Sequence, residues 1–549
     1  MFPNKKIETY ILLGSIFLLA LVLRVYMLSQ FPVGFHIDEA SLGYNGYSLL
    51  LTGKDENNNA HPLYIDMFGD NRPSGYHYLT IIPVKLFGLN EFSTRLPAAV
   101  FGAISIFAMY SLCSVIFRSK KISLISSLFI AIAPWHVVLS RASGEAVVAL
   151  FFILTGFAFI LHSLQKKSEI FLIIGTISVI SSFFFYHTPR VFVPMLYVAM
   201  LFFLRSQWGK TKNVKYVVYL IFSCVITLLT TAALVFLVSG GTGRFAQVNI
   251  FGHPETKLVM NEQIQEDGIE KKPLIETRIV HNKIINYSLT FASNYLEYFS
   301  GSFLFTKGGL PIWYLVPGMG LVYIVLLPFI ILGIVYSIAS DQHLYKVPLV
   351  WLIVAPITAA ITVDDIPNIN RAIVLFPMLE LFAAFGISIF ITRYYKSKTF
   401  LLIIVIALCI FFNFFYFIHQ YFTHTSQHRT WYRNNGFKEM LTIVKKEYDQ
   451  YDKILVTKSA GGIYPLILFY MKYDPIIYQS EGSPKGPDYG GFGKFYFVPQ
   501  ACPTIDKDNR FPADKKILYI NKGDCSDDPV VRFTDIYRED GTRAFRMEL

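Results

Sequence analysis

Long apolar blocks alternate with short polar connections through most of the chain. Each block holds about 17 to 25 predominantly apolar residues, the length that an α-helix needs to cross the hydrocarbon core of a bilayer. The pattern predicts a mainly α, polytopic membrane protein. The expected helices, about eleven in number, lie at residues 9–28, 94–117, 122–139, 146–163, 169–186, 190–205, 216–238, 313–336, 347–362, 372–391 and 399–419.

From Thr423 onward the hydropathy falls and a second pattern begins. Helical periodicity alternates with short runs of β-branched and aromatic residues, and such alternation favours a small α/β domain. The helices are expected at 436–448 and 463–473, and the strands at 453–457, 495–498, 516–520 and 531–537. We therefore divide the chain into a transmembrane module, residues 1–422, and a C-terminal domain, residues 423–549.

Lysine and arginine residues gather in every second connection, at 5–6, 118–121, 166–167, 205–215, 346 and 393–398. Connections rich in these residues are retained on the cytoplasmic side. This predicts a cytoplasmic N-terminus, and an odd number of spans then places the C-terminal domain outside the cytoplasm. The remaining connections are extracytoplasmic, and the two largest are a first outer loop at 29–93 and a long outer loop at 239–312.

The two large outer loops differ in pattern. In the first, apolar residues between Glu39 and Leu51 predict a short amphipathic helix in the membrane interface, which Gly53 would end. The second has a glycine-rich start and a mixed polar run at 253–282, which indicate a mobile lid or partly inserted helices rather than a folded domain.

The first outer loop also contains three motifs in a fixed order. Asp38-Glu39 follow the first apolar block, Arg72-Pro73 come later, and F-G-x-N-x-x-S-x-R-x-P at 87–97 opens the second block. In this order they resemble the first outer loop of GT-C fold glycosyltransferases of the family 39 type, which use polyprenyl-phosphate sugars. That family includes protein O-mannosyltransferases and the lipid A aminoarabinose transferase. The resemblance covers residues 1–120 in motifs, and the rest of the chain only in its pattern of spans.

The resemblance implies an inverting transfer of a sugar, such as mannose or another hexose or a pentose, to a protein, lipid or glycan acceptor on the outer face of the plasma membrane. This reaction needs a carboxylate to take the acceptor proton and cations to hold the departing phosphate. We expect Asp38 to be the base and Glu39 to assist it. A helix cap is the alternative role for Asp38.

The cations expected to bind the donor phosphate lie in the outer connections and are Arg72, Arg141, Arg190 and Arg371. For Arg72, contact with lipid headgroups is the alternative interpretation, and for Arg141 and Arg190 it is extension of the side chain to the membrane interface. The residues expected to line the acceptor or sugar pocket are Tyr44, Tyr76, Glu145 and His187.

No cofactor is assigned with certainty. Asp364 and Asp365 are candidate ligands of a divalent metal, although adjacent side chains point in different directions on most backbones and a solvated loop is the alternative. The histidines lack the H-E-x-x-H spacing of a zinc site. Cys502 and Cys525 are candidates for a disulfide if the C-terminal domain faces an oxidising compartment.

The net charge of +11 does not indicate a nucleic-acid partner, because the cations lie between apolar blocks in a chain that is 53% hydrophobic. Two other classes remain as alternatives, a transporter or flippase of lipid-linked sugars and a non-catalytic protein of cell-envelope assembly. A transport path normally carries more charged residues within the spans than Arg24 and Glu380.

Overall fold

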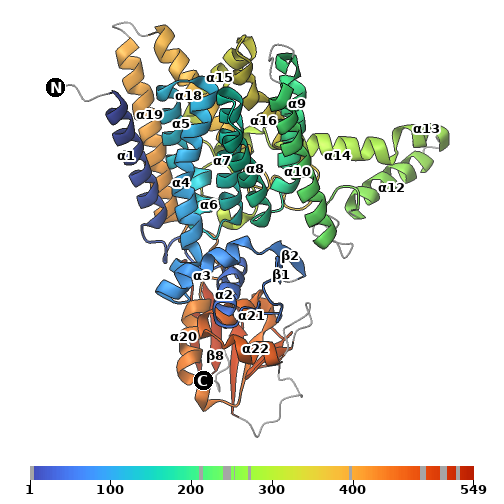
Figure 1. The fold of residues 1–549 in the computed structure, drawn as a ribbon. Coiled ribbons are helices and arrows are strands. Elements are labelled where there is room, and N and C mark those ends of the chain that lie inside the picture. The colour runs from blue at the N-terminus through green and yellow to red at the C-terminus, as the bar shows by residue number, and fades with distance from the viewer. Residues whose placement is uncertain are drawn as a thin grey trace. The chain divides into compact units, whose positions relative to one another are not determined.

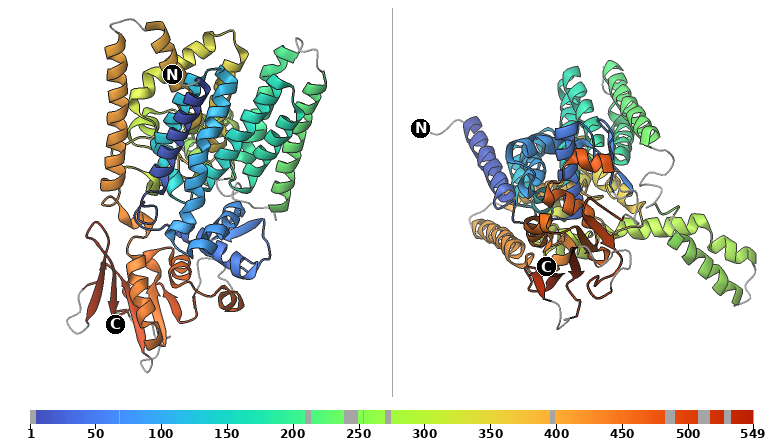
Figure 2. Two further views of the ribbon diagram at one scale, coloured as in Figure 1. Left: turned by 60° about the vertical axis from the view of Figure 1, so that its left-hand side comes forward. Right: turned by 90° about the horizontal axis from the view of Figure 1, so that it is seen from below.

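The computed structural model describes residues 5–67, 69–208, 214–238, 249–252, 254–269, 274–394, 399–481, 490–506, 516–526 and 532–548. The chain forms two compact units, and each is described by itself (Figures 1 and 2). The helical unit comprises Met1–Leu23, Phe101–Val138 and Ala146–Phe417. The α/β unit comprises Arg24–Val100, Leu139–Glu145 and Ile418–Leu549.

Long apolar helices make up most of the helical unit, where α18 packs against both α15 and α5 (Figure 1). Some of these helices start or end in the α/β unit. In chain order they are α1 (Lys5–Val25), α4 (Glu91–Phe117), α5 (Lys120–Ile132), α6 (Pro134–Arg141), α7 (Glu145–Lys166), α8 (Glu169–Ser181), α9 (Pro189–Trp208), α10 (Val214–Val238), α15 (Leu327–Ala339), α16 (Val347–Val354), α17 (Ile357–Ala360), α18 (Phe376–Tyr394) and α19 (Thr399–His419).

Seven helices among the described residues are long and apolar enough to cross a membrane: Ile7–Val25, Glu91–Phe117, Glu145–Lys166, Val218–Phe236, His343–Ala360, Phe376–Arg393 and Phe400–His424. The pair α5 and α6 qualifies as an eighth span if its 52° bend is allowed. Three shorter apolar helices account for the remaining predicted segments, at Glu169–Phe184, Pro189–Phe203 and Ile324–Ala339. The mainly α, polytopic fold is confirmed.

One predicted span starts too early. In the apolar stretch at 313–336 a 3-10 turn, Ile312–Tyr314, comes first, and continuous helix begins only at Ile324, as a second 3-10 turn that continues into α15. The residues before it include Pro317 and Gly318, and Gly318 has a φ of +68°. Proline removes a helical hydrogen-bond donor and a left-handed glycine ends a helix, so hydropathy alone placed the boundary wrongly.

The long outer loop contains three helices, α12 (Pro254–Ile269), α13 (Leu274–Val280) and α14 (Lys283–Glu297), whereas residues 239–248, 253 and 270–273 lie outside the described part of the chain. No residue of α14 is buried, yet the helix is attached at its C-terminal half. The Asn294 amide donates to the carbonyl oxygens of Ala360 and Thr362 at 3.2 and 3.0 Å. Helices in this loop were predicted, and whether they enter the membrane stays a prediction.

The α/β unit contains a six-stranded sheet in the order β4-β5-β3-β6-β8-β7. Strand β3 pairs in parallel with β5 and β6, and β8 pairs antiparallel with β6 and β7. The strands are β3 (Lys453–Thr457), β4 (Gly491–Phe492), β5 (Phe495–Val498), β6 (Ile517–Lys522), β7 (Phe533–Tyr537) and β8 (Arg543–Glu548), and the helices are α20 (Phe437–Glu447), α21 (Ile463–Met471) and α22 (Pro475–Glu481). The predicted C-terminal α/β domain is therefore present, with β4, β8 and α22 as additions to the prediction.

The first outer loop folds onto this sheet-containing domain. It forms α2 (Ile37–Thr52), the hairpin β1 (Tyr64–Met67) and β2 (Asp70–Pro73), and α3 (Gly75–Phe87). Helix α2 packs against α3 and α21, and its buried Tyr44 belongs to the same apolar core as Phe469. A Cβ atom on Gly43 would lie 2.6 Å from the Phe469 ring, so only glycine permits this approach.

The amphipathic helix predicted in this loop is thus present, and it ends at Gly53, which has a φ of +69°. Its apolar residues Leu42, Tyr44 and Leu49, however, are covered by protein, whereas Leu51 is exposed. The pattern that predicted lipid contact is the same pattern that packs a helix onto a soluble core.

Cys502 and Cys525 are joined by a disulfide in the α/β unit. Of the other cysteines, Cys113 and Cys224 are buried and Cys409 is exposed.

Glu56 follows α2 and is almost fully buried, and its carboxyl oxygens have no hydrogen-bond partner among the described residues. Burial raises the pKa of Glu56 to about 8, and the neighbouring Asp55 and Asp66 add to the shift. In an unfolded chain a glutamate titrates at about 4.3. Because the folded pKa is the higher one, Glu56 costs stability progressively as the pH rises from about 4.3 to about 8.

We expect Glu56→Gln to raise the unfolding temperature of the purified protein by several degrees at pH 8.5 and to change it little at pH 4.5. Glu439→Gln, which replaces an exposed carboxylate of the same unit, should have no such effect. An equal gain for Glu56→Gln at both pH values would contradict the buried-acid interpretation.

Candidate active site

The N-terminus of α2 is built from the residues His36-Ile37-Asp38-Glu39. His36 is the N-cap, and its Nδ1 accepts a hydrogen bond from the backbone N–H of Asp38 at 3.2 Å. In return the Glu39 carboxylate accepts from the backbone N–H of His36 at 3.2 Å, which completes a capping box. This local sequence therefore starts the helix and fixes where Asp38 and Glu39 stand.

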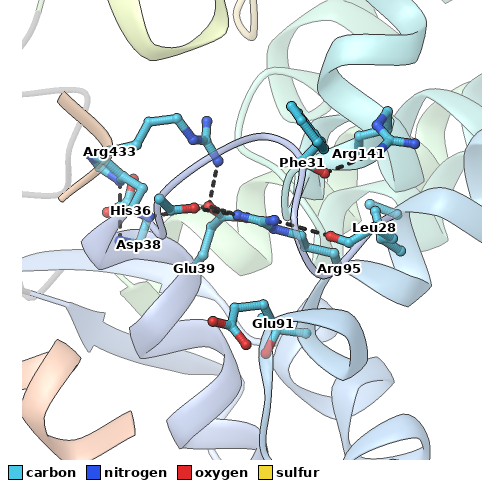
Figure 3. A network of polar contacts seen from close by, with 12 residues as sticks. Leu28, Phe31, His36, Asp38, Glu39, Glu91, Arg95, Arg141 and Arg433 are labelled. Carbon is cyan, nitrogen blue, oxygen red and sulfur yellow. Dashed lines mark hydrogen bonds and ion pairs between the residues drawn. The ribbon is translucent and has the colours of Figure 1, made fainter. Parts of the chain in front are cut away.

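Glu39 lies between two arginines from distant parts of the chain (Figure 3). Arg95 donates from Nε to Oε1 at 2.9 Å, and Arg433 donates from Nη2 to Oε2 at 2.6 Å. The side chain of Glu39 is only 4% exposed. Burial alone would raise the pKa of Glu39, but Arg95 and Arg433 outweigh it and lower the pKa to about 2.

Asp38 has a different environment from its neighbour. Its Oδ2 lies 3.2 Å from Nη1 of Arg72, which comes from strand β2, and its side chain keeps 28% of its exposure. Burial would raise the pKa of Asp38, but Arg72 and His36 lower it below its usual range. Asp38 is therefore an ionised carboxylate that a second molecule can reach, whereas Glu39 is enclosed.

Arg72 is surrounded by acidic groups. Its Nε donates to Oδ2 of Asp70 at 3.1 Å while Nη1 contacts Asp38. Burial would lower the pKa of Arg72, but Asp38, Glu145 and Asp70 together raise it above its usual range. The guanidinium stays charged, and 22% of its side chain remains exposed.

Glu145 and His77 complete the surroundings of Arg72. Glu145 stands at the first position of α7 and is 8% exposed. His77, on α3, is fully buried, and burial together with the charge of Arg72 lowers its pKa to about 3. His77 thus presents a neutral imidazole near physiological pH. Glu145, expected to line an acceptor or sugar pocket, interacts electrostatically with Arg72, and its place in a pocket stays a prediction.

Arg141, expected on the donor phosphate, is enclosed by aromatic side chains. Its Nε donates to the Tyr421 hydroxyl and its Nη2 to the Phe31 carbonyl oxygen, both at 3.2 Å. The guanidinium carbon lies 5.5 and 5.1 Å from the ring centroids of Tyr421 and Phe422. Arg141 is fully buried, so in this structure it binds protein rather than an open site.

The two tyrosines expected in a pocket are also buried. Tyr44 donates to the carbonyl oxygen of Tyr473 at 3.1 Å, and Tyr76 donates to that of Thr94 at 2.9 Å. Both rings have no exposed surface. The sequence analysis expected them in a sugar or acceptor pocket, whereas here both side chains are packed inside the protein.

The remaining candidates belong to the helical unit. Arg190 donates twice to the carbonyl oxygen of Phe183, at 3.1 and 2.7 Å, and lies 3.2 Å from Nδ1 of His187. Arg371 donates to Oγ1 of Thr362 at 2.8 Å and to the backbone oxygen of Asp364. Arg190 lies in the first turn of α9, and Arg371 lies in the turn segment between α17 and α18.

Asp364 and Asp365 remain the candidate metal ligands of the sequence. Among the described residues, no group of three or more His, Cys, Asp or Glu side chains is placed to hold a metal ion. Asp365 has a φ of +52°, which marks the tight turn between the two carboxylates and Arg371.

Two arginines that hold Glu39 were not among the candidate residues of the sequence analysis. Arg95 is the arginine of the F-G-x-N-x-x-S-x-R-x-P motif, and its place in that motif was its only signal. Arg433 follows the last predicted span and carries no motif. Its partner Glu39 is 394 positions away, so no local pattern reveals the contact.

Residues 71–236 match the family model described as dolichyl-phosphate-mannose-protein mannosyltransferase. No curated protein sequence matches the chain. Solved structures resemble it at low identity. ArnT from Cupriavidus metallidurans in the apo state aligns with a TM-score of 0.54 and 11% identity over 100% of this chain and 99% of that chain.

The same ArnT bound to undecaprenyl phosphate aligns with a TM-score of 0.53 and 11% identity over 98% of both chains. Archaeal oligosaccharyltransferase AglB from Archaeoglobus fulgidus, in complex with an inhibitory peptide and a dolichol-phosphate, aligns with a TM-score of 0.50 and 15% identity over 85% of this chain. The chain spans 64% of the AglB chain. Together these matches confirm the resemblance to GT-C fold membrane glycosyltransferases of the family 39 type.

We expect Glu39→Gln to destabilise the α/β unit strongly, because it leaves Arg95 and Arg433 buried without their counter-charge. Breaking a buried ion pair from one side costs about 3 to 5 kcal/mol, or roughly 10 °C in unfolding temperature for a unit of this size. Thermal unfolding of the purified variant measures the loss.

Asp524→Asn is the matched control. It breaks the 2.7 Å pair with Lys522, in which both side chains are largely exposed. Such pairs contribute at most about 1 kcal/mol, so the unfolding temperature should hardly move. Equal losses in the two variants would mean that burial does not distinguish the two pairs.

Proposed function

We propose that this protein is an integral-membrane glycosyltransferase that moves a sugar from a polyprenyl-phosphate donor to an acceptor hydroxyl. The observation that carries the proposal is the contact between Asp38 and Arg72, an accessible base beside an accessible cation. The GT-C fold and the family match that starts at residue 71 support it.

Asp38 is proposed as the general base. The acceptor oxygen attacks the anomeric carbon as its proton passes to the Asp38 carboxylate. The bond between that carbon and the phosphate oxygen breaks, and its electron pair leaves with the polyprenyl phosphate. A single displacement of this kind inverts the configuration at the anomeric carbon. Arg72 and His36 lower the pKa of Asp38, so the base is ready in its ionised form at neutral pH.

Arg72 is proposed to hold the departing phosphate. A guanidinium binds phosphate oxygens through two parallel N–H donors, and in the free protein the donors of Arg72 contact Asp38 and Asp70. When the phosphate occupies part of this fork, it weakens the hold of Arg72 on Asp38. The pKa of Asp38 then rises, and the carboxylate becomes a stronger base once the donor is present.

The carrier is proposed to be a polyprenyl phosphate, in keeping with the undecaprenyl phosphate of ArnT and the dolichol-phosphate of AglB. Arg190 and Arg371 are proposed, on the sequence resemblance alone, as further donor-phosphate ligands. The acceptor is proposed to be a hydroxyl of a protein, a lipid or a glycan.

The reaction is proposed to take place on the outer face of the plasma membrane, with a cytoplasmic N-terminus. The disulfide between Cys502 and Cys525 supports this orientation, because disulfides persist in oxidising compartments and the α/β unit that carries it also carries Asp38.

Asp38→Asn tests the base. Loss of a general base lowers a rate by about 10² to 10⁴-fold, and we expect transfer of labelled sugar from a polyprenyl-phosphate donor in membranes to fall by that factor at equal expression. Asp524→Asn should transfer at the wild-type rate. Wild-type transfer by Asp38→Asn would exclude Asp38 as the base.

Arg72→Gln tests the partner cation. In this variant Asp38 stays buried to the same extent but loses the positive charge of Arg72. The pKa of Asp38 should therefore rise, and the acid limb of kcat/KM should move to higher pH. The affinity for polyprenyl phosphate should fall roughly tenfold or more, the value of a charged hydrogen bond. Arg429→Gln, an exposed arginine of the same unit, should change neither quantity. If the acid limb does not shift, Arg72 does not control the pKa of the catalytic base.

A further inference from the structure

The C-terminal domain holds the catalytic end of α2. Arg433, which precedes α20, reaches the Glu39 carboxylate at 2.6 Å (Figure 3). A Cβ atom on Gly34 would lie 2.4 Å from the carbonyl oxygen of Arg433. A Cβ atom on Gly462, just before α21, would lie 2.1 Å from Cγ2 of Ile37. The chain on both sides of His36 therefore lies directly against the domain.

The other end of α2 has a separate attachment. The Gln479 amide nitrogen, on α22, lies 3.0 Å from Oγ of Ser48 and 3.1 Å from Oγ1 of Thr52. It also donates to the carbonyl oxygen of Asp55 at 2.9 Å. The two attachments use different residues of the domain, so they can be broken one at a time.

Arg433 is itself fixed to the sheet. It ends a 3-10 turn, Thr430–Arg433, that is flanked by Arg429 and Asn434, both with left-handed φ values, 57° and 54°. The hydroxyl of Thr430 donates to Oδ2 of Asp540 at 2.8 Å, in the turn between β7 and β8. Movement of the sheet domain is thus transmitted to Glu39.

Glu39 transmits that position to Asp38, because the two residues are neighbours on one helix and share one capping box. Arg95 contacts both oxygens of Glu39, Oε1 from Nε at 2.9 Å and Oε2 from Nη2 at 3.2 Å, and Arg433 adds a second contact to Oε2. Together these contacts restrict rotation and sliding of the helix end. A displacement of about 1 Å at a reacting group lowers a rate by about 10²-fold. A displacement of this size at the start of α2 would lengthen the 3.2 Å contact between Asp38 and Arg72.

We infer that the C-terminal domain is a positioning element for Asp38 and that Arg433 is its positioning residue, acting through Glu39. The inference rests on the proposed glycosyl transfer for its kinetic consequence. It gives the domain a role in catalysis that does not require it to bind an acceptor.

The kinetic test is Arg433→Gln in the full-length protein. We expect kcat for sugar transfer to fall by about 10 to 10²-fold with an unchanged KM for the donor, because the lost interaction acts on the base and not on the phosphate. Arg433→Lys, which keeps the charge, should recover part of the rate.

Gln479→Leu is the matched control, because it breaks the attachment of the same domain at the far end of α2. It should leave kcat per folded molecule unchanged. A similar fall in both variants, or a rise in the donor KM of Arg433→Gln, would overturn the positioning role.

Hydrogen exchange gives a readout that does not depend on transfer. In Arg433→Gln the backbone amides of residues 38–42 should exchange at least tenfold faster than in the wild type, and those of residues 48–53 should be unchanged. If the wild-type protein transferred no sugar, the proposed function would be wrong. The exchange measurement would still show whether Arg433 holds the start of α2 in place. Unchanged exchange at 38–42 would overturn the inference.

Discussion

The structure of the α/β unit depends on one buried carboxylate. Glu39 neutralises two arginines. Arg95 lies at the start of the second span, and Arg433 lies in the segment that follows the last span. A buried guanidinium without a counter-charge costs several kcal/mol, so neither arginine can occupy its place unless α2 brings Glu39 to it. The first outer loop, the start of α4 and the C-terminal domain are therefore brought together at one side chain.

This constraint separates the roles of two adjacent acids. Successive residues of a helix point in directions about 100° apart, so Asp38 and Glu39 face different surroundings although they share a capping box. The enclosed acid, with its oxygens occupied by Arg95, Arg433 and the His36 backbone, fixes the helix. The accessible acid, opposite Arg72, is the one that we propose as the base. A base needs both properties nearby, because its carboxylate must be open to the acceptor and yet held in place.

Much of this architecture could be predicted from the sequence. Apolar blocks of membrane-spanning length located the helices, and Gly53 marked the end of α2. The order of Asp38, Arg72 and the 87–97 motif indicated the resemblance to GT-C fold glycosyltransferases, and it singled out both residues without predicting their contact. These signals are local, since each depends on residues within one helix or one loop. The error at 313–336 was local as well, because hydropathy outweighed the Pro317-Gly318 pair.

The remainder was beyond local patterns. Tyr44 and Tyr76 look like pocket residues. Tyr44, however, shares a core with residues of α21, which is far away in sequence, and Tyr76 donates to Thr94 of α4, 18 positions away. Arg141 looks like a phosphate ligand until Tyr421 and Phe422 are placed around it. The role of Arg433 follows only from a contact across 394 positions. A motif can locate a charged residue. Whether its side chain binds a ligand or another part of the protein depends on its tertiary neighbours.

A structure of the protein with a polyprenyl phosphate bound tests the central claim most directly. We expect the phosphate to lie within hydrogen-bond distance of the Arg72 guanidinium, the contact between Arg72 and Asp38 to lengthen, and Glu39 to keep its contacts with both arginines. A phosphate beyond the reach of Arg72, with the Asp38–Arg72 pair unchanged, would place the chemistry elsewhere.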